Sequence, residues 1–564
     1  MTALLSSAAI SAQLPEIVEE EDLLRAGEGW LMEKEGLRVA YFKGSPQEIG
    51  IQHGLLVVDD PESMQEAMQL LDPASQAREL GERIAWFFKD LYARFKFIPA
   101  FKRHIPDEYL QEMEGFIIGA SRGEESNYHE IIMSNSYQDL ELAGPGCSAF
   151  AAWGEASRDG ELYLGRNLDH LGMLPLADYQ YLAFYQPEEG YPFAVHNYPS
   201  FVGTMSGMNS QGIVITSNYS PARSEEVTID GLPYMIMIRQ ALQYGGSLEE
   251  VIEIIKETPR TVGLNLMIAD AEANKAVVAE VTASRIQIRE KEDFIYASNM
   301  YRDPHLQQFQ DTGWHASTLR DNRFARLGDQ LWGEMGIQEA RDIMRDRFHP
   351  ESTAGRGFVS GINDLATIAS MVFAPQRGEI WVSTRGDSNS PDGSFIGFNA
   401  RKIWERGQPV EPIGLLPPTE RDEYLEHWFK VREAEMKIRE HRDHQQVIDL
   451  LQPVLDQKPK SELPLLYTAR GHLRLGEYSK GLEYLRQFTG LQEHAEPYYL
   501  LQGLFLCGLL SDHLGEREEA LECYRRILEL EIEDYFGEPM QHHWARIGLE
   551  EPLALTEEGG VKKQ

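Results

Sequence analysis

Two short segments constrain this chain more than any other feature. The first is the turn-like Gly144-Pro145-Gly146, which leads into Cys147-Ser148-Ala149-Phe150, and the second is Gly165-Arg166-Asn167-Leu168-Asp169. Glycine and proline favour a tight turn, so the first segment predicts a strand that starts at Cys147. The second predicts the end of the next strand. The pattern therefore places a small nucleophilic residue at one strand start and an Arg-x-x-Asp sequence at the neighbouring strand end.

A thiol at the start of a strand can attack the carbonyl that precedes it, here that of Gly146. The acyl bond then moves from nitrogen to sulfur, and water releases a new chain that begins at Cys147. Gly146 has no side chain to obstruct this attack. An α-amine titrates near pH ~8 in model compounds, so the freed amine could take the thiol's proton without a separate histidine. We therefore expect self-cleavage between Gly146 and Cys147.

The chain has three cysteines, and only Cys147 lies in this context. Cys507 and Cys523 fall in a helical pattern far downstream, where buried core positions are expected. A lone cysteine in an apolar strand is commonly an inert core residue, which is the alternative for Cys147. So few cysteines argue against a disulfide framework.

The two segments, joined by Asp159-Gly160-Glu161-Leu162-Tyr163-Leu164, resemble the nucleophile hairpin of the N-terminal-nucleophile (Ntn) amidohydrolases. The resemblance is to the conjugated bile-acid hydrolases and the penicillin (isopenicillin N) acyltransferases. The Gly-Arg-Asn-x-Asp string is nearer the first group, while the leader segments 44–54 and 114–120 look more like the second. The resemblance extends over residues 38–400 and implies a four-layer αββα sandwich.

The resemblance also implies roles for individual residues. Cys147 would be the nucleophile through its sulfur and the base through its amine, and Asp169 would hydrogen-bond that amine. Arg166 would favour thiolate character beside the sulfur or hold a substrate carboxyl.

Three later segments complete the predicted site. In 206–215 the backbone N–H of Asn209 would line an oxyanion hole, and in 294–299 the Asn299 side chain would supply the second donor. In 317–323, Arg320 would anchor the catalytic groups without touching the substrate.

Each of these residues also has a purely structural interpretation. Asn209 could form a hairpin turn, and Asn299 could satisfy buried backbone groups at a strand end. Arg166 and Asp169 could form an ordinary salt bridge, and Arg320 could be a solvated helix residue. The occurrence of all of them in the family's order favours catalysis.

Composition excludes several other classes of function. The chain has 564 residues and a net charge of −37, from 90 acidic and 53 basic residues. A nucleic-acid ligand is disfavoured because phosphate backbones need a basic surface. No apolar run is long enough to span a membrane, and no zinc spacing, phosphate loop or dinucleotide fingerprint occurs, so no metal or cofactor is expected. Residues 4–13 make a poor secretion signal, so a cytoplasmic location is expected over a secreted or periplasmic one.

The chain divides into five predicted parts, and the expected fold class is α+β. Residues 1–146 are a mostly helical leader, with helices expected over 83–92 and 109–117, and would become the small chain after cleavage. Residues 147–405, with short apolar or alternating runs, are the αββα catalytic domain. A proline-rich linker over 406–420, with Pro409, Pro412, Pro417 and Pro418, precedes helical repeats over 421–540 and a tail over 541–564.

The repeats are visible as an internal alignment. Residues 475–486 match 514–525, and a weaker copy begins at His444. They resemble tetratricopeptide repeats, an all-α solenoid. They would cap the catalytic domain, form a homodimer, or bind a protein partner.

The predicted function is a self-processing cysteine Ntn hydrolase that cleaves linear N-acyl amides of small molecules through a thioester on Cys147. The acyl group would pass to water or to an amine, and the sequence does not separate these two outcomes. The small and large chains would remain associated. The alternative is a catalytically silent scaffold that presents the repeats to a protein partner.

Overall fold

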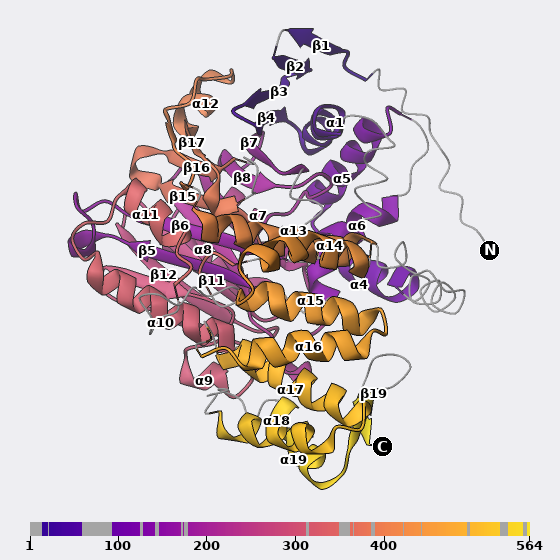
Figure 1. Cartoon of the computed structure of the whole chain (residues 1–564). Coiled ribbons are helices and arrows are strands. Elements are labelled where there is room, and N and C mark those ends of the chain that lie inside the picture. The colour runs from indigo at the N-terminus through magenta and orange to yellow at the C-terminus, as the bar shows by residue number, and fades with distance from the viewer. Residues whose placement is uncertain are drawn as a thin grey trace.

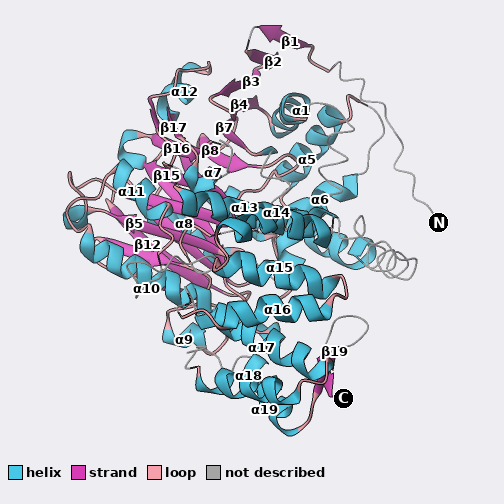
Figure 2. Cartoon of the chain, viewed as in Figure 1, coloured by secondary structure: helices cyan, strands magenta, loops and turns pink. Residues whose placement is uncertain are grey.

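Two large β-sheets form the centre of the molecule (Figures 1 and 2). The structure, a computed structural model, describes residues 14–20, 22–58, 93–123, 128–140, 146–170, 173, 179–311, 315–348, 361–364, 366–384, 390–420, 422–441, 443–492, 494, 497–530, 540–555 and 561–563. The helix expected over 83–92 lies outside these residues. No helix in the described parts of the chain is both long and apolar enough to cross a membrane.

The larger sheet has eleven strands in the order β1-β2-β3-β4-β7-β8-β9-β10-β11-β12-β13. Their bounds are β1 Ile17–Glu20, β2 Leu23–Ala26, β3 Gly29–Lys34, β4 Leu37–Gly44, β7 Tyr181–Pro187, β8 Phe193–Asn197, β9 Ser206–Asn209, β10 Ile213–Tyr219, β11 Leu264–Asp270, β12 Lys275–Val281 and β13 Ile286–Arg289. The pairs are antiparallel except for the parallel pair of β4 with β7.

The smaller sheet has seven strands in the order β14-β5-β6-β15-β16-β17-β18. Their bounds are β14 Phe294–Ala297, β5 Cys147–Ala152, β6 Tyr163–Asp169, β15 Thr367–Ala374, β16 Glu379–Ser383, β17 Phe395–Asn399 and β18 Gly414–Leu416.

Successive side chains along a strand point to opposite faces of the sheet, and the buried clusters show which layer each face contacts. In β7, Leu182 and Phe184 belong to the core between the two sheets, while Tyr181 and Tyr185 face the helices that cover the larger sheet. These helices are α1 Pro46–Val57, α4 Ile98–Lys102, α5 Asp107–Ala120, α6 Tyr128–Leu140, α7 Tyr234–Tyr244 and α8 Leu248–Glu257. Helices α10 His315–Gln330 and α11 Ile337–Met344 cover the smaller sheet through a third core. The fold is therefore mixed α/β, with two sheets between helical layers.

The segment before Cys147 is less helical than the sequence predicts. Helix α5 spans the expected 109–117, but residues 17–44 form strands β1–β4 and belong to the larger sheet. Strand β4 is central and buried on both faces, so its sequence lacks the alternation of a half-exposed strand. The leader is thus part of the sandwich rather than a separate helical unit.

The two leader motifs of the sequence lie against each other as helices α1 and α5. Helix α1 starts with a capping box in which Ser45 and Glu48 satisfy each other's backbone N–H groups. A Cβ atom at Gly50 would lie 2.0 Å from the carbonyl oxygen of Glu112, and one at Gly119 would lie 2.3 Å from that of Ile51. Glycine therefore allows the two helix backbones to approach closely.

The proline-rich segment is not an isolated linker. Its residues 414–416 form β18, which pairs with β17 at the edge of the smaller sheet, and the Pro417 carbonyl accepts a hydrogen bond from Arg345 at 2.9 Å. The chain is therefore fixed to the sandwich as far as Pro417.

Seven helices and a small hairpin follow among the described residues after 420. Figure 1 shows the helices stacked from α13, in the middle of the view, down to α19 near the C-terminus. They are α13 Glu423–His441, α14 His444–Gln457, α15 Glu462–Arg474, α16 Tyr478–Thr489, α17 Pro497–His513, α18 Arg517–Glu529, α19 Met540–Glu550, β19 Leu553–Leu555 and β20 Val561–Lys563. The aligned copies share one turn: Gly476 and Gly515 have φ of 75° and 83° between paired helices. The expected tail contains α19 and the hairpin.

Candidate active site

Cys147 is the first residue of β5, as the sequence predicts. Strands β5 and β6 are antiparallel, with Cys147 opposite Leu168 and Ala149 opposite Arg166. The Arg-x-x-Asp sequence therefore returns to the start of β5, and the predicted hairpin is confirmed. The cysteine side chain is buried.

Arg166 and Asp169 do not form the salt bridge that their spacing allowed. They are three residues apart on β6, so their side chains leave opposite faces of the strand. Asp169 instead pairs with Arg320, whose Nη1 lies 3.0 Å from Oδ2 of Asp169. The two arginines thus reach Cys147 from different sides.

Arg166 spans the space between the two sheets. Its Nη2 lies 2.8 Å from the carbonyl oxygen of Ser217 on β10 and 3.8 Å from Sγ of Cys147, and its Nε donates to the hydroxyl of Ser206 on β9. The side chain is fully buried. These contacts hold a fixed positive charge beside the thiol.

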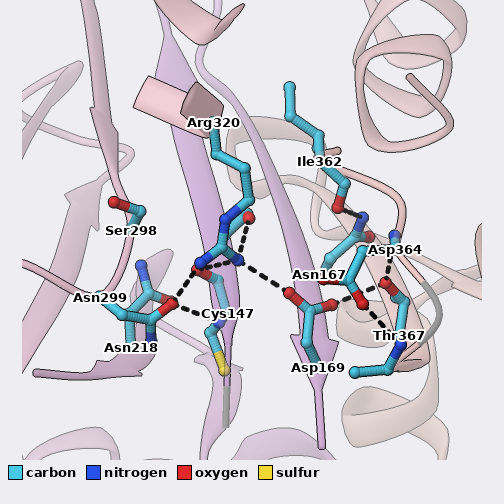
Figure 3. Close-up of polar contacts among 12 residues, drawn as sticks. Cys147, Asn167, Asp169, Asn218, Ser298, Asn299, Arg320, Ile362, Asp364 and Thr367 are labelled. Atoms are coloured by element: carbon cyan, nitrogen blue, oxygen red, sulfur yellow. Dashed lines mark hydrogen bonds and ion pairs between the residues drawn. The ribbon is translucent and has the colours of Figure 1, made fainter. Parts of the chain in front are cut away.

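Arg320 links the other groups of the site (Figure 3). Its Nη1 donates to the Cys147 carbonyl at 3.1 Å and to Ser148 Oγ at 3.1 Å, and its Nη2 donates to Asn299 Oδ1 at 2.7 Å. Arg320 is 1% exposed, so the solvated-helix interpretation is wrong. These hydrogen bonds hold the start of β5.

Asn299 lies at the cysteine's backbone nitrogen. Its Oδ1 accepts a hydrogen bond from the Cys147 N–H at 2.8 Å, and its Nδ2 donates to the Tyr219 carbonyl at 2.7 Å. The oxygen faces two donors and the nitrogen faces a carbonyl, so the contacts define the orientation of the amide. In the uncut chain this residue fixes the nitrogen that cleavage would convert into an amine.

Burial and the neighbouring positive charge have opposite effects on the pKa of the Cys147 thiol. Burial raises the pKa of Cys147, the charge of Arg166 lowers it, and the backbone N–H of Asp169 also favours the thiolate. Burial likewise raises the pKa of Asp169 well above its usual range, the carboxyl of Asp364 raises it further, and Arg320 opposes both effects.

Asn209 is not at this site, which corrects the sequence prediction. Its Oδ1 accepts the N–H groups of Gln211 and Ile213 at 3.0 Å each, and its Nδ2 donates to Gly245 at 2.7 Å, so it holds the β9–β10 turn. The hairpin register places it opposite Ile213. Five strand residues of about 3.3 Å each separate that end of β10 from Asn218, roughly 16 Å.

The residue that sequence reasoning missed is Asn218, near the other end of β10. It is fully buried, donates to the Ala297 carbonyl at 2.8 Å, and lies beside Asn299 and Cys147 in Figure 3. The available signal was a polar Ser217-Asn218 pair near the end of the apolar strand β10. Thr367 and Asp364 were also missed; Thr367 Oγ1 donates to Asp169 Oδ1 at 2.7 Å. No group of three or more metal-ligating side chains occurs among the described residues.

Part of the chain is similar to known proteins. Residues 156–389 match the family of acyl-coenzyme A:6-aminopenicillanic acid acyl-transferase. An uncharacterized protein of Archaeoglobus fulgidus is 23% identical over 428 residues, which are 67% of each chain. Protein dcd1B of Dictyostelium discoideum is 24% identical over 56% of this chain, and the match spans 62% of dcd1B.

Two solved structures also resemble the chain, each at 15% identity. One is a Caenorhabditis elegans ortholog of N-acylethanolamine-hydrolyzing acid amidase, with a TM-score of 0.30 over 41% of this chain and 93% of that one. The other is a mutant of conjugated bile acid hydrolase from Clostridium perfringens, with a TM-score of 0.32 over 49% of this chain and 99% of that one.

Proposed function

We propose that the chain is a self-processing cysteine Ntn amidohydrolase or acyltransferase that cleaves linear N-acyl amides. The observation that carries the proposal is the convergence on Cys147. Arg166 lies at its sulfur, Asn299 at its nitrogen and Arg320 at its carbonyl. The match of residues 156–389 to an acyltransferase family supports acyl chemistry at this site.

In the first step, Cys147 Sγ attacks the Gly146 carbonyl carbon, and the Gly146–Cys147 C–N bond breaks to leave a thioester and an amine. Water then hydrolyses the thioester. A Cβ atom at residue 146 would lie 3.3 Å from Arg320 Nη1 and 3.5 Å from Asp169 Oδ2. Glycine therefore keeps the scissile bond close to the Arg320–Asp169 ion pair.

The freed amine would be held where its amide nitrogen already lies. Asn299 Oδ1 accepts from that nitrogen at 2.8 Å, and the Asp169 carboxyl, which would lie 3.5 Å from a Cβ atom at residue 146, would stabilise a positive charge on the new amine of Cys147. The amine would then take the thiol proton when a substrate binds. The acyl group would leave the thioester for water or for an acceptor amine.

We infer that the amide side chain of Asn218 takes the oxyanion-binding role that the sequence assigned to the backbone N–H of Asn209. Asn218 is buried beside Cys147, whereas Asn209 is committed to a turn. Loss of one donor at an oxyanion typically costs ~10²–10³ in rate.

The processed fragments would remain together. Strand β4 pairs with β7 across the cleavage point, and Glu112 of α5 forms a buried ion pair with Arg239 of α7. We further propose that α14–α18 are tetratricopeptide-like hairpins, because the aligned copies share helix–turn–helix geometry.

Denaturing mass spectrometry tests the proposal. Active protein should give fragments 1–146 and 147–564, and Cys147→Ala should stay whole and inactive. Cys507→Ala is the matched control, because this cysteine is also buried but lies in α17. Uncut wild-type protein that hydrolyses amides at full rate would refute the free-amine mechanism.

A further inference from the structure

A C-terminal helix reaches the catalytic centre. Arg432 of α13 is 4% exposed, and its Nη2 donates to the carbonyl of Thr367 at 2.8 Å. Thr367 is the first residue of β15, on the strand next to β6. A contact between these two residues therefore joins the helical region to the sheet that carries Cys147.

Thr367 transmits this contact to Asp169. Its Oγ1 donates to Asp169 Oδ1 at 2.7 Å and accepts the backbone N–H of Asp364 at 3.0 Å. The register of β15 against β6 shifts between Thr367 and Ala369, and this irregularity aligns Thr367 with Asp169. The position of the Asp169 carboxylate thus depends on where the Thr367 backbone is held.

Arg432 is itself held by a buried cluster. The ring of Trp428, one helical turn earlier, lies 4.9 Å from the guanidinium carbon of Arg347 and 5.9 Å from that of Arg432. Asp392 pairs with Arg347 and accepts from Asn363 Nδ2 at 3.1 Å. An arginine packed in this way has few rotamers available, so its donor to Thr367 is fixed in place.

We propose that Arg432 is a positioning residue, which fixes Thr367 and through it Asp169, so that helix α13 completes the catalytic centre. The inference rests on the proposed function of Asp169. The C-terminal helices are then more than a cap or a dimer surface, because their first member supports the groups around Cys147.

Charge reinforces this geometry. The charged and titratable groups that act on Asp169 are Cys147, Arg166, Arg320, Asp364 and Arg432, and those that act on Arg432 are Asp169, Asp364, Arg347 and Asp392. Burial raises the pKa of Asp364 to about 6, while Arg320 and Arg432 oppose this rise. Loss of the Arg432 charge would let the Asp169–Asp364 pair bind its first proton at a higher pH.

The test compares Arg432→Gln, which removes the charge, with Asp364→Asn and the control Lys430→Met on the exposed face of α13. We expect Arg432→Gln to slow self-cleavage and turnover of a fluorogenic N-acyl-aminocoumarin by roughly ten- to hundredfold, since a ~1 Å misplacement can cost ~10². The acid limb of its pH–rate profile should move to higher pH. Asp364→Asn should move that limb to lower pH, and Lys430→Met should change neither quantity.

Wild-type rates and an unmoved acid limb in folded Arg432→Gln would overturn the inference. If that variant does not fold, Arg432→Lys keeps the charge but loses the planar fork. It should slow self-cleavage while leaving the acid limb in place, and an undiminished rate would again overturn the inference. If the wild type itself is inactive, the proposed function is wrong, and activity can no longer test the role of Arg432. Titration of ¹³C-labelled aspartate carboxyls in wild type and Arg432→Gln then judges the inference alone, because the pair should titrate higher in the variant.

Discussion

The ion pair between Glu112 and Arg239 offers a sharp test of how the leader is held. Glu112 lies in α5 before the proposed cleavage point, Arg239 lies in α7 after it, and each side chain is 2% exposed. The contact is bidentate, at 3.2 and 2.9 Å. The Arg239 guanidinium also lies over the rings of Phe193 and Tyr185, at 4.3 and 4.5 Å.

Glu112→Leu would leave this guanidinium buried with no anion beside it. Removal of one partner of a buried pair typically costs ~3–5 kcal/mol. Large domains lose about 2 °C of melting temperature per kcal/mol, so the melting temperature should fall by roughly 6–10 °C. Replacement of both partners by apolar residues is often neutral, so Glu112→Leu/Arg239→Met should recover most of the loss.

Scanning calorimetry of the uncleavable Cys147→Ala background measures these differences without the complication of processing. Glu114→Leu, at an exposed position of the same helix, is the control and should change the melting temperature little. In processed protein, Glu112→Leu should also release fragment 1–146 at a lower urea concentration. A loss below about 1 kcal/mol, or a double variant no better than the single one, would refute the reasoning.

Three further predictions concern the site and its surroundings. Asp169→Asn should lower turnover by about a hundredfold or more while the protein stays folded, because Arg320 loses its anion and the amine its partner; near-normal turnover would remove Asp169 from the mechanism. Asn218→Ala should lower the chemical step by ~10²–10³ in single-turnover assays, whereas Asn209→Ala, which keeps its backbone N–H and loses the turn contacts, should lower stability and leave that step within a few-fold; a normal rate in Asn218→Ala would remove the Asn218 side chain from the mechanism. Burial raises the pKa of Asp139 to about 7, so its contribution to stability is present below pH ~4 and is lost as pH rises through 7. Asp139→Asn should therefore flatten the decline in urea midpoint over that range, and an unchanged decline would contradict this cause.

The hairpin around Cys147 could be predicted because local signals agreed. Turn residues, an apolar strand and a return strand define a register within 25 residues, from Gly146 to His170. The roles of Asp169 and Arg320 could be approached only through the resemblance. Arg166 and Asp169 are three residues apart on a strand, so the sequence already implied that their side chains leave opposite faces of β6. Asp169 is therefore free to pair with Arg320 on its own face.

The sequence placed the oxyanion residue at Asn209 and not at Asn218 because only Asn209 lies in a recognisable local pattern. Asn209 lies in a Met-Asn-x-x-Gly turn, a pattern that attracts attention because it satisfies backbone groups locally. Asn218 has no such signature, since its contact is with Ala297, a residue 79 positions away in sequence. Sequence reasoning therefore selected the asparagine with the stronger local signal and missed the one defined by tertiary contact.

The segment over 406–420 was predicted as a linker for a related reason, and part of it forms an edge strand instead. Four prolines over 409–418 indicate a linker because proline ends regular structure, yet proline is also compatible with an edge strand, and β18 is one. A linker would have made the C-terminal helices independent of catalysis. Strand β18 instead keeps the chain on the smaller sheet as far as Leu416, and Arg432 of α13 donates to the Thr367 carbonyl across 65 residues of sequence. Because an edge strand and not a linker precedes the C-terminal helices, we expect them to support Asp169 and not to be an independent domain.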